Sequence, residues 1–140
     1  MNEYKYLWVP FLSWLSVQLI KFITDIIKNK KINLKVLVAS GGMPSSHSSI
    51  VTTLMTMIGI NEGFNSILFS IAFVFGMIVM YDAAGVRRAA GKQAGILNQL
   101  IYSNQVKVDT NEKLKELIGH TPKQVFVGAL WGIALGIIFA

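Results

Sequence analysis

The sequence predicts an all-α integral membrane protein: a bundle of about four transmembrane helices with additional interfacial helices. Two observations favour this class. Hydrophobic residues make up 53% of the 140 residues and charged residues only 14%, a composition too apolar for an ordinary soluble domain. Long apolar runs recur along the chain, and at about 1.5 Å per helical residue several can cross a hydrocarbon core of about 30 Å. A chain of this length forms at most one domain, so we expect residues 1–140 to make a single membrane-embedded unit.

The first apolar run, Leu7–Ile27, is long enough to span a bilayer. It contains Lys21, about two turns from its end. A lysine in such a place either extends to the interface or is a functional residue within the span. The loop that follows is basic and contains Lys28, Lys30, Lys31 and Lys35.

The stretch Ser40–Ser49 separates this loop from the next apolar run and holds two glycines, a proline, five serines and a histidine. Pro44 suits the first turn of a helix. A helix beginning there would direct the free N–H groups of Ser45, Ser46 and His47 toward an anion, for which phosphate is the usual ligand. The same residues are also typical of an ordinary helix cap, so the stretch alone does not decide between the two.

Further helices are predicted before the last histidine. Ser48–Ile60 predicts a short helix whose three threonines suit the interior of a bundle. Phe64–Ala84 is the cleanest span, with no charged residue before Asp82. Arg87–Tyr102 is amphipathic and predicts a helix that continues this span or lies along the interface. A capping pattern then predicts a short helix over Asp109–Gly119.

The last span is predicted over Val125–Ala140. Thr121 is a suitable N-cap for it, Pro122 a suitable first helical residue, and Gln124 the matching capping-box residue. Three glycines repeat every four residues on one face of this helix: Gly128, Gly132 and Gly136. Such a face favours close helix packing within the bundle or, alternatively, a homo-oligomer interface.

The net charge of +6 could indicate nucleic-acid binding, but the basic residues border long apolar runs. An anionic membrane surface therefore fits better, and we expect no nucleic-acid partner. Four spans would place both termini on one side and nearly every Lys and Arg on the other. We therefore expect the protein in the cell membrane, and by the positive-inside rule its basic side faces the cytoplasm. The chain has no cysteine, which excludes disulfides and thiolate chemistry.

The chain has two histidines, His47 and His120, each near the start of a predicted helix and on the basic side. Two imidazoles can divide phosphoryl transfer, since one can attack phosphorus while the other protonates the departing oxygen. Cationic side chains can neutralise charge on the phosphate oxygens. The sequence lacks an acidic cluster typical of a catalytic metal, so neither a metal nor another cofactor is expected.

The string Pro44–His47 resembles the P-S-G-H signature of the type 2 phosphatidic acid phosphatase superfamily, which includes lipid phosphate phosphatases and vanadium haloperoxidases. The strings Ser40–Ser49, Asp82–Gln93 and Gly119–Gly132 are more similar to the divergent small-protein branch of that superfamily. The resemblance covers most of the chain. It implies a reduced phosphatase core built as a helical bundle, and phosphomonoester hydrolysis through a phosphohistidine without a metal.

The resemblance assigns residues as well. It implies that His120 is the nucleophile, that His47 is the acid and base, and that Ser45 and Ser46 form the phosphate-binding turn. The first motif of the superfamily is a lysine followed after six residues by Arg-Pro. Lys21 and Lys28 have that spacing, but Lys28-Asn29 replaces Arg-Pro and removes the bidentate fork of arginine.

Two further positions depart from the superfamily pattern. The phosphate-binding arginine normally stands a few residues before the nucleophile, whereas Arg87 and Arg88 stand some thirty residues earlier; of the two, Arg88 is slightly favoured. Gln124 occupies the position of an aspartate that orients the nucleophile. A glutamine can orient the imidazole but cannot stabilise its charged form. Asp82 could supply the missing charge if the fold brings it near.

Taken together, the residues predict a membrane phosphatase that acts on a lipid phosphate or polyprenyl phosphate. The tail of the substrate would stay in the bilayer while its head meets the histidines and cations. The replacement of aspartate by Gln124 and the altered first motif favour an alternative: a catalytically weak or inactive protein that binds phosphate or lipid headgroups. A third reading is a structural membrane protein whose histidines cap helices.

Overall fold

The computed structural model describes residues 4–38, 41–103, 114 and 119–140. All regular secondary structure in these residues is helical, which confirms the predicted all-α class. The elements are α1 (Lys5–Asn29), the 3₁₀ helix η1 (Leu34–Val38), α2 (Ser46–Glu62), α3 (Ile67–Ala84), α4 (Val86–Tyr102) and α5 (Pro122–Phe139). The predicted short helix over Asp109–Gly119 lies almost entirely outside the described residues.

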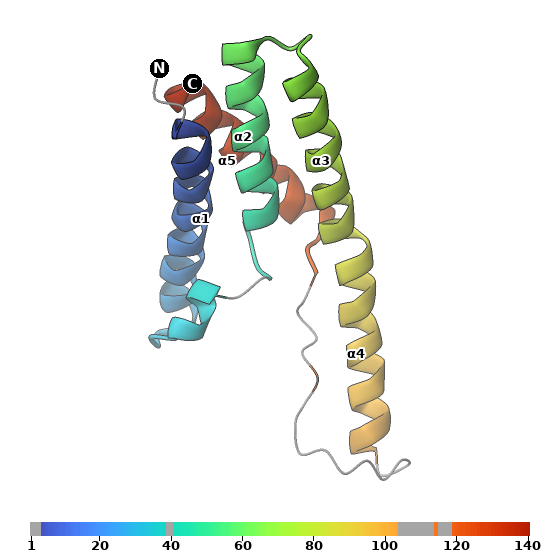
Figure 1. Ribbon diagram of the computed structural model, residues 1–140. Helices are drawn as coiled ribbons and strands as arrows, with labels where there is room; N and C mark the ends of the chain where they lie inside the picture. The colour runs from blue at the N-terminus through green and yellow to red at the C-terminus, as the bar shows by residue number, and fades with distance from the viewer. Residues whose placement is uncertain (1–3, 39–40, 104–113, 115–118) are drawn as a thin grey trace.

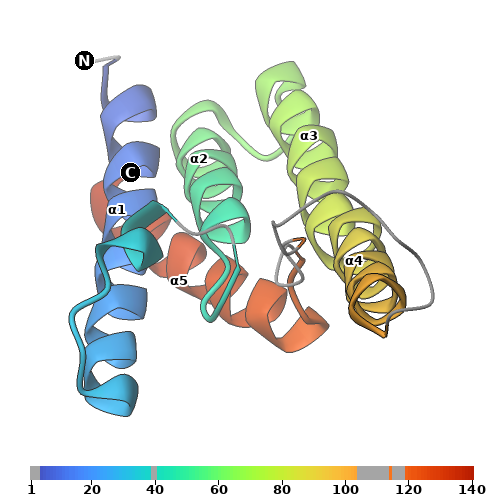
Figure 2. The ribbon, with the colours of Figure 1, turned by 90° about the horizontal axis from the view of Figure 1, so that it is seen from below.

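Helix α2 is the centre of the bundle. It lies between α1 and α3 and makes its most extensive contacts with α5, which crosses the other helices at a steep angle (Figures 1 and 2). The start of α1 and the end of α5 lie at the same end of the bundle as the turn that joins α2 to α3 (Figure 1). The segments that carry both histidines therefore lie toward the opposite end.

Three helical segments are long and apolar enough to cross a membrane by length and composition: α1, the joined segment Ile67–Tyr102 and α5. Helix α2 has 17 residues. It begins two residues before and ends two residues after the predicted helix Ser48–Ile60. Helix α3 begins at Ile67 rather than at Phe64, because the hydroxyl of Ser66 caps it by accepting from the N–H of Phe69 at 3.1 Å. The predicted bundle of about four helices thus consists of three long apolar segments around a shorter central helix.

The glycines of α5 pack against α2. A Cβ atom added to Gly128 would collide with the backbone of Ser45, and one added to Gly132 would collide with Thr52. Gly136, one turn further on, faces α2 in the same way and is also buried. The glycine face is therefore used for close packing within the chain, and it is not free to serve as the homo-oligomer interface of the alternative interpretation.

Close approach of α2 and α5 lets side-chain hydroxyls of one helix reach backbone carbonyls of the other. Thr52 Oγ1 donates to the carbonyl of Ala129 at 3.1 Å. Thr53 Oγ1 lies 3.0 Å from the carbonyl of Gly132 and 2.8 Å from the hydroxyl of Ser13 on α1. These hydrogen bonds satisfy polar groups that an apolar bundle would otherwise leave unpaired, and they link α2 to both α1 and α5.

Helix α4 follows α3 after a break at Gly85, whose φ and ψ are −98° and −87°. It extends beyond the end of the bundle (Figure 1), so the amphipathic segment continues the third span. Asn98 holds the returning chain against α4, since its side chain bonds both the carbonyl and the N–H of Leu114, at 2.8 and 2.9 Å.

Candidate active site

The serine-rich turn that begins α2 differs in two details from the prediction. The helix begins at Ser46 with Ser45 as its N-cap, and Pro44 precedes it in a cis peptide bond instead of occupying the first turn. The N–H of Ser45 is not free, because it donates to the carbonyl of Gln124 on α5 at 3.0 Å. The helix start therefore presents the N–H groups of Ser46 and His47, which have no intrahelical partner by position.

The hydroxyls of this turn are buried and bonded to one another. Ser45 Oγ accepts from the N–H of Ser48 at 3.3 Å and lies 3.0 Å from its hydroxyl. Lys21 is 5% exposed, and its ammonium group lies 3.5 Å from the hydroxyl of Ser46. Lys21 is thus directed into the bundle toward the start of α2 rather than along α1 to the interface.

His120 is fully buried at the entry to α5, and its backbone N–H donates to the carbonyl of Ala83 at 3.0 Å. The preceding residue, Gly119, packs directly on the backbone of Arg87 and Arg88, where any Cβ would collide. The chain therefore leaves the bundle at the α3–α4 break and returns to the same place. This is why arginines about thirty residues from His120 in sequence lie beside it in space.

The capping box predicted at the start of α5 is present: the Oε1 atom of Gln124 accepts from the N–H of Thr121 at 2.9 Å. The same Oε1 atom lies 3.4 Å from Nδ1 of His120. A backbone N–H can only donate, so the amide atom that faces it is the oxygen, and Nδ1 of His120 must carry the hydrogen that this oxygen accepts. The lone pair of the imidazole then resides on Nε2.

Nε2 of His120 is buried, and no described residue forms a hydrogen bond of good geometry with it, although the backbone of Gly42 acts on the ring. Nδ1 of His47, in the first turn of α2, is likewise buried without a hydrogen bond to a described residue. The two imidazole rings are neighbours, with centroids 5.7 Å apart and an edge-to-face angle of 65°. Unpaired buried nitrogens are uncommon because each costs its desolvation energy, and catalytic sites are among the places where they occur.

Asp82 and Arg87 form an ion pair across the α3–α4 break, with Nε of Arg87 2.6 Å from Oδ2 of Asp82. Arg88, which the sequence slightly favoured, is exposed. Burial lowers the pKa of His120 below its ordinary value, and the positive charges of Lys21 and Arg87 lower it further, while hydrogen bonds to Gln124 and to the backbone of Gly42 raise it. Arg87 is thus the arginine whose charge acts on the imidazole, and Gln124, rather than Asp82, is the residue bonded to that ring.

Lys28 is exposed in the last turn of α1, and the structure does not bring it together with the histidines. The side chain of Arg88 is exposed, although its backbone contacts Gly119. The remaining predicted residues gather around the start of α2 and the entry to α5: Lys21, Ser45, Ser46, His47, Asp82, Arg87, His120 and Gln124. Gly119 was not predicted as a site residue, and its position just before His120 is the one signal that could have indicated it.

In the described part of the chain no three His, Asp or Glu side chains are placed to hold a metal ion.

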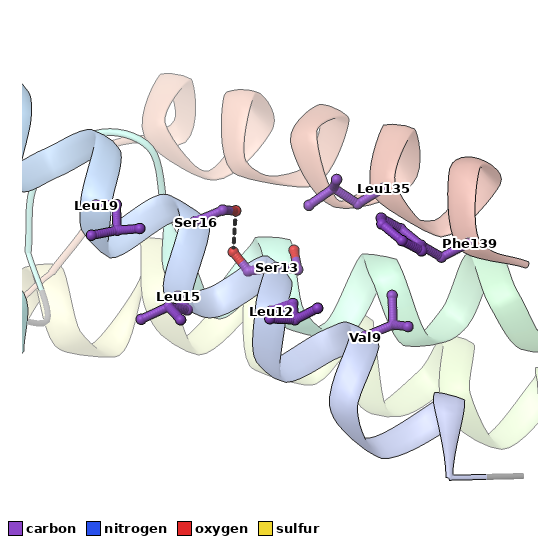
Figure 3. A pocket seen from close by; sticks show the side chains of 8 residues that line it. All are labelled: Val9, Leu12, Ser13, Leu15, Ser16, Leu19, Leu135 and Phe139. Carbon is purple, nitrogen blue, oxygen red and sulfur yellow. Dashed lines mark hydrogen bonds between the residues drawn. The ribbon is translucent and has the colours of Figure 1, made fainter.

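A separate groove of about 270 Å³ lies between α1 and α5 (Figure 3). Its lining is apolar apart from Ser13 and Ser16, whose hydroxyl donates to the carbonyl of Ser13 at 2.8 Å (Figure 3). Trp131 of α5 also contacts this region, because its indole N–H donates to the hydroxyl of Ser16 at 2.9 Å. The groove contains none of the candidate site residues, so it lies apart from the imidazole pair and its cations.

Comparisons with known proteins agree with the resemblance seen in the sequence. The profile of a family described as "Divergent PAP2 family" matches residues 2–135. A Bacillus subtilis protein described as "Uncharacterized membrane protein YuiD" is 40% identical in an alignment that covers 94% of this chain and 93% of that protein. No solved structure is significantly similar to the chain.

Proposed function

Since this chain belongs to the Divergent PAP2 family, we propose that it is a membrane phosphatase that hydrolyses a lipid phosphate or polyprenyl phosphate through a phosphohistidine on His120. One observation carries the proposal. His120 is anchored at Nδ1 by Gln124, its buried Nε2 forms no hydrogen bond of good geometry with a described residue, and the ring of His47 stands beside it. A nucleophile held by one nitrogen and open at the other, next to an acid, is the arrangement that two-step phosphoryl transfer requires.

In the first step, the lone pair of Nε2 of His120 attacks phosphorus and forms a nitrogen–phosphorus bond. The bond from phosphorus to the leaving oxygen breaks. His47 reacts in its protonated form, although burial and the charge of Arg87 lower its pKa. It gives its proton to that oxygen, so the lipid product leaves as a neutral alcohol.

In the second step, a water molecule attacks the phosphorus of the phosphohistidine. His47, now neutral, takes a proton from that water. The nitrogen–phosphorus bond breaks, its electron pair returns to Nε2 of His120, and inorganic phosphate leaves. Both histidines are then in their starting protonation states.

Charge on the phosphoryl oxygens is balanced by groups that surround the imidazole pair. Lys21 is buried beside Ser46, and Arg87 lies at the α3–α4 break next to Gly119. The N–H groups that begin α2 add the positive end of a helix dipole. These groups are fixed before a substrate arrives, which is the condition under which electrostatic stabilisation is most effective.

A membrane location favours a substrate with an apolar tail and an anionic head. The start of α2 and the start of α5, which the histidines adjoin in sequence, lie toward the end of the bundle opposite the turn between α2 and α3 (Figure 1). By the positive-inside rule we assign this side to the cytoplasm, so the head of the lipid would be hydrolysed at the inner leaflet.

One observation favours a second candidate, a protein that binds phosphate or lipid headgroups without turnover. Gln124 orients His120 but supplies no negative charge to stabilise the imidazolium that forms as phosphate departs. This candidate predicts phosphate binding by the wild type with no release of phosphate from any lipid phosphate.

The test is turnover by the purified full-length protein in vesicles, with phosphatidic acid and a polyprenyl phosphate as substrates. We expect the wild type to release phosphate, and His120→Ala to reduce the rate by roughly 10³-fold or more. Lys123→Ala is the matched control, because Lys123 is exposed and one residue from Gln124. Undiminished turnover by His120→Ala would exclude His120 as the nucleophile, and phosphate binding without any wild-type turnover would favour the second candidate.

His47→Ala separates the role of the acid from that of the nucleophile. A nitrophenolate leaving group needs no proton, so this variant should retain the first step with nitrophenyl phosphate and lose it with lipid phosphates. Equal losses with both substrates would exclude His47 as the acid.

A further inference from the structure

Asp82 and Arg87 are neighbours only because the helix is broken between them. Residues five apart in a continuous helix lie about 140° apart around its axis, and residues three or four apart are the ones that meet. The break at Gly85 interrupts this geometry while its N–H still bonds the carbonyl of Tyr81 at 2.8 Å. The sequence Asp82–Arg87 therefore folds so that the carboxylate meets the guanidinium across the break.

The ion pair uses one particular atom of the arginine. Asp82 binds Nε of Arg87 at 2.6 Å, and no described residue accepts from the two terminal nitrogens. A guanidinium carries five N–H donors in a planar fork. A partner on Nε fixes the plane of the fork and leaves the terminal nitrogens for a second acceptor with two oxygens, such as phosphate.

The charge of Arg87 acts on both imidazoles, so its side chain lies near the site of such an acceptor. The backbone of Arg87 packs on Gly119, the residue before the nucleophile of the proposed reaction. Asp82 and Arg87 are each about 40% exposed, at 40% and 41%, so a ligand can reach the pair. Arg87 is therefore both adjacent to the imidazoles and accessible.

We propose that Asp82 is a positioning residue: it holds Arg87 through Nε so that the terminal nitrogens of the guanidinium bind a phosphate at His120. This role rests on the phosphate site of the proposed function. It differs from the role that the family pattern gives to a carboxylate, which is to orient the histidine. Here Gln124 holds the histidine and the carboxylate holds the arginine.

Positioning and simple electrostatics predict opposite results when Asp82 is neutralised. Asp82→Asn removes a negative charge beside the site, so charge alone would make phosphate bind more tightly. Positioning predicts weaker binding, because the amide is a poorer partner for Nε and the guanidinium is no longer held in one plane. The sign of the change therefore distinguishes the two.

The experiment measures binding of inorganic phosphate to the full-length protein in detergent micelles by phosphorus NMR. We expect Asp82→Asn to weaken binding roughly tenfold, and Asp82→Glu to recover part of the loss because it keeps a carboxylate. In a background of Arg87→Ala, Asp82→Asn should have no further effect, since the two residues act as one unit. Asp25→Asn is the matched control: it removes the same charge from α1, where Asp25 bonds Asn29 at 2.7 Å.

Unchanged or tighter phosphate binding by Asp82→Asn would overturn the positioning role, as would a further loss in the Arg87→Ala background. Either result would leave the hydrolase proposal to be judged by turnover. Conversely, a wild type that binds phosphate with the expected pattern but releases none from lipid phosphates would refute the hydrolase and retain the role of Asp82.

Discussion

The Oε1 atom of Gln124 lies 3.4 Å from Nδ1 of His120 while it accepts a hydrogen bond from the N–H of Thr121. The helix cap and the orientation of the imidazole therefore depend on one amide oxygen. A carboxylate at this position could make both contacts and would also stabilise a charged imidazole. The amide of Gln124 makes both contacts but carries no negative charge.

Gln124→Leu removes this acceptor at nearly constant volume. We expect phosphate release from lipid phosphates to fall roughly 10- to 100-fold, because Nδ1 of His120 is no longer held and the lone pair is not fixed on Nε2. Gln124→Glu keeps the acceptor and should retain turnover. Lys123→Leu, at an exposed neighbouring position, controls for the effect of the substitution on α5. Equal rates for Gln124→Leu and the wild type would show that the amide serves only as a cap.

The pKa of His120 is lowered by burial and by the charge of Lys21, so its imidazole should titrate below the ordinary value of about 6.5. Because the chain has two histidines, NMR of histidine-labelled protein can follow each ring. Lys21→Met removes a positive charge and should move the titration of His120 upward. A titration of His120 at or above pH 6.5 in the wild type, or a downward movement in Lys21→Met, would contradict this.

The same lowered pKa has a consequence for stability. Below about pH 6.5 the unfolded chain takes up a proton on His120 that the folded chain does not, so the free energy of unfolding should fall as the pH drops from 7.5 to 5.5. His120→Gln removes this group and should show a smaller dependence on pH. Thermal unfolding in detergent at the two pH values measures the difference. If the unfolding temperature changes equally between the two pH values in the wild type and in His120→Gln, the prediction is wrong.

Gly132→Ala tests the close packing of α5 on α2. The added methyl group would collide with Thr52, and we expect a loss of about 1–3 kcal/mol in the free energy of unfolding. Gly76→Ala is a matched control in α3, because its added Cβ would lie 3.7 Å from Met55 Sδ, an ordinary contact. If the two variants unfold at the same temperature, the glycine face is not tightly packed.

Gly119→Ala tests the return of the chain to the α3–α4 break. A Cβ at this position collides with the backbone of Arg88, so His120 should be displaced from Arg87. We expect phosphate binding and turnover to fall by roughly tenfold or more. Gly76→Ala again serves as the control. Unaltered phosphate binding by Gly119→Ala would show that this contact does not position the site.

The helices were predictable because each depends on its own stretch of sequence. Apolar runs marked α1, α3 and α5, and the capping box at Thr121 and Gln124 located the start of α5 to the residue. The bounds of α2 were less predictable. Its serines and threonines are polar, so they weaken the apolar signal, and they are buried only because the glycines of α5 let the two helices approach closely.

The residues that the structure brings together at the candidate site could be named from the sequence, but the way in which they pair could not. Nothing local to Ser45 indicates that its N–H bonds Gln124, nearly eighty residues away. The pairing of Asp82 with Arg87 depends on a helix break whose dihedral angles cannot be inferred from one glycine. The choice between Arg87 and Arg88 depends on the same break, which explains why the sequence slightly favoured the exposed residue.

The orientation of the protein is the last prediction. The loop after α1 is basic, whereas the turn between α2 and α3 lies at the end of the bundle that holds the start of α1 and the end of α5 (Figure 1). Since the chain has no cysteine, Lys31→Cys and Asn65→Cys each introduce a unique thiol at an exposed position. By the positive-inside rule, an impermeant thiol reagent added to intact cells should label Asn65→Cys, and should label Lys31→Cys only after permeabilisation. Ala72→Cys, buried in the bundle, should resist the reagent in both conditions. The reverse pattern would place the histidines at the outer leaflet. Labelling of both loops from outside would exclude a bundle in which α2 crosses the membrane, because α2 is the helix between these two positions.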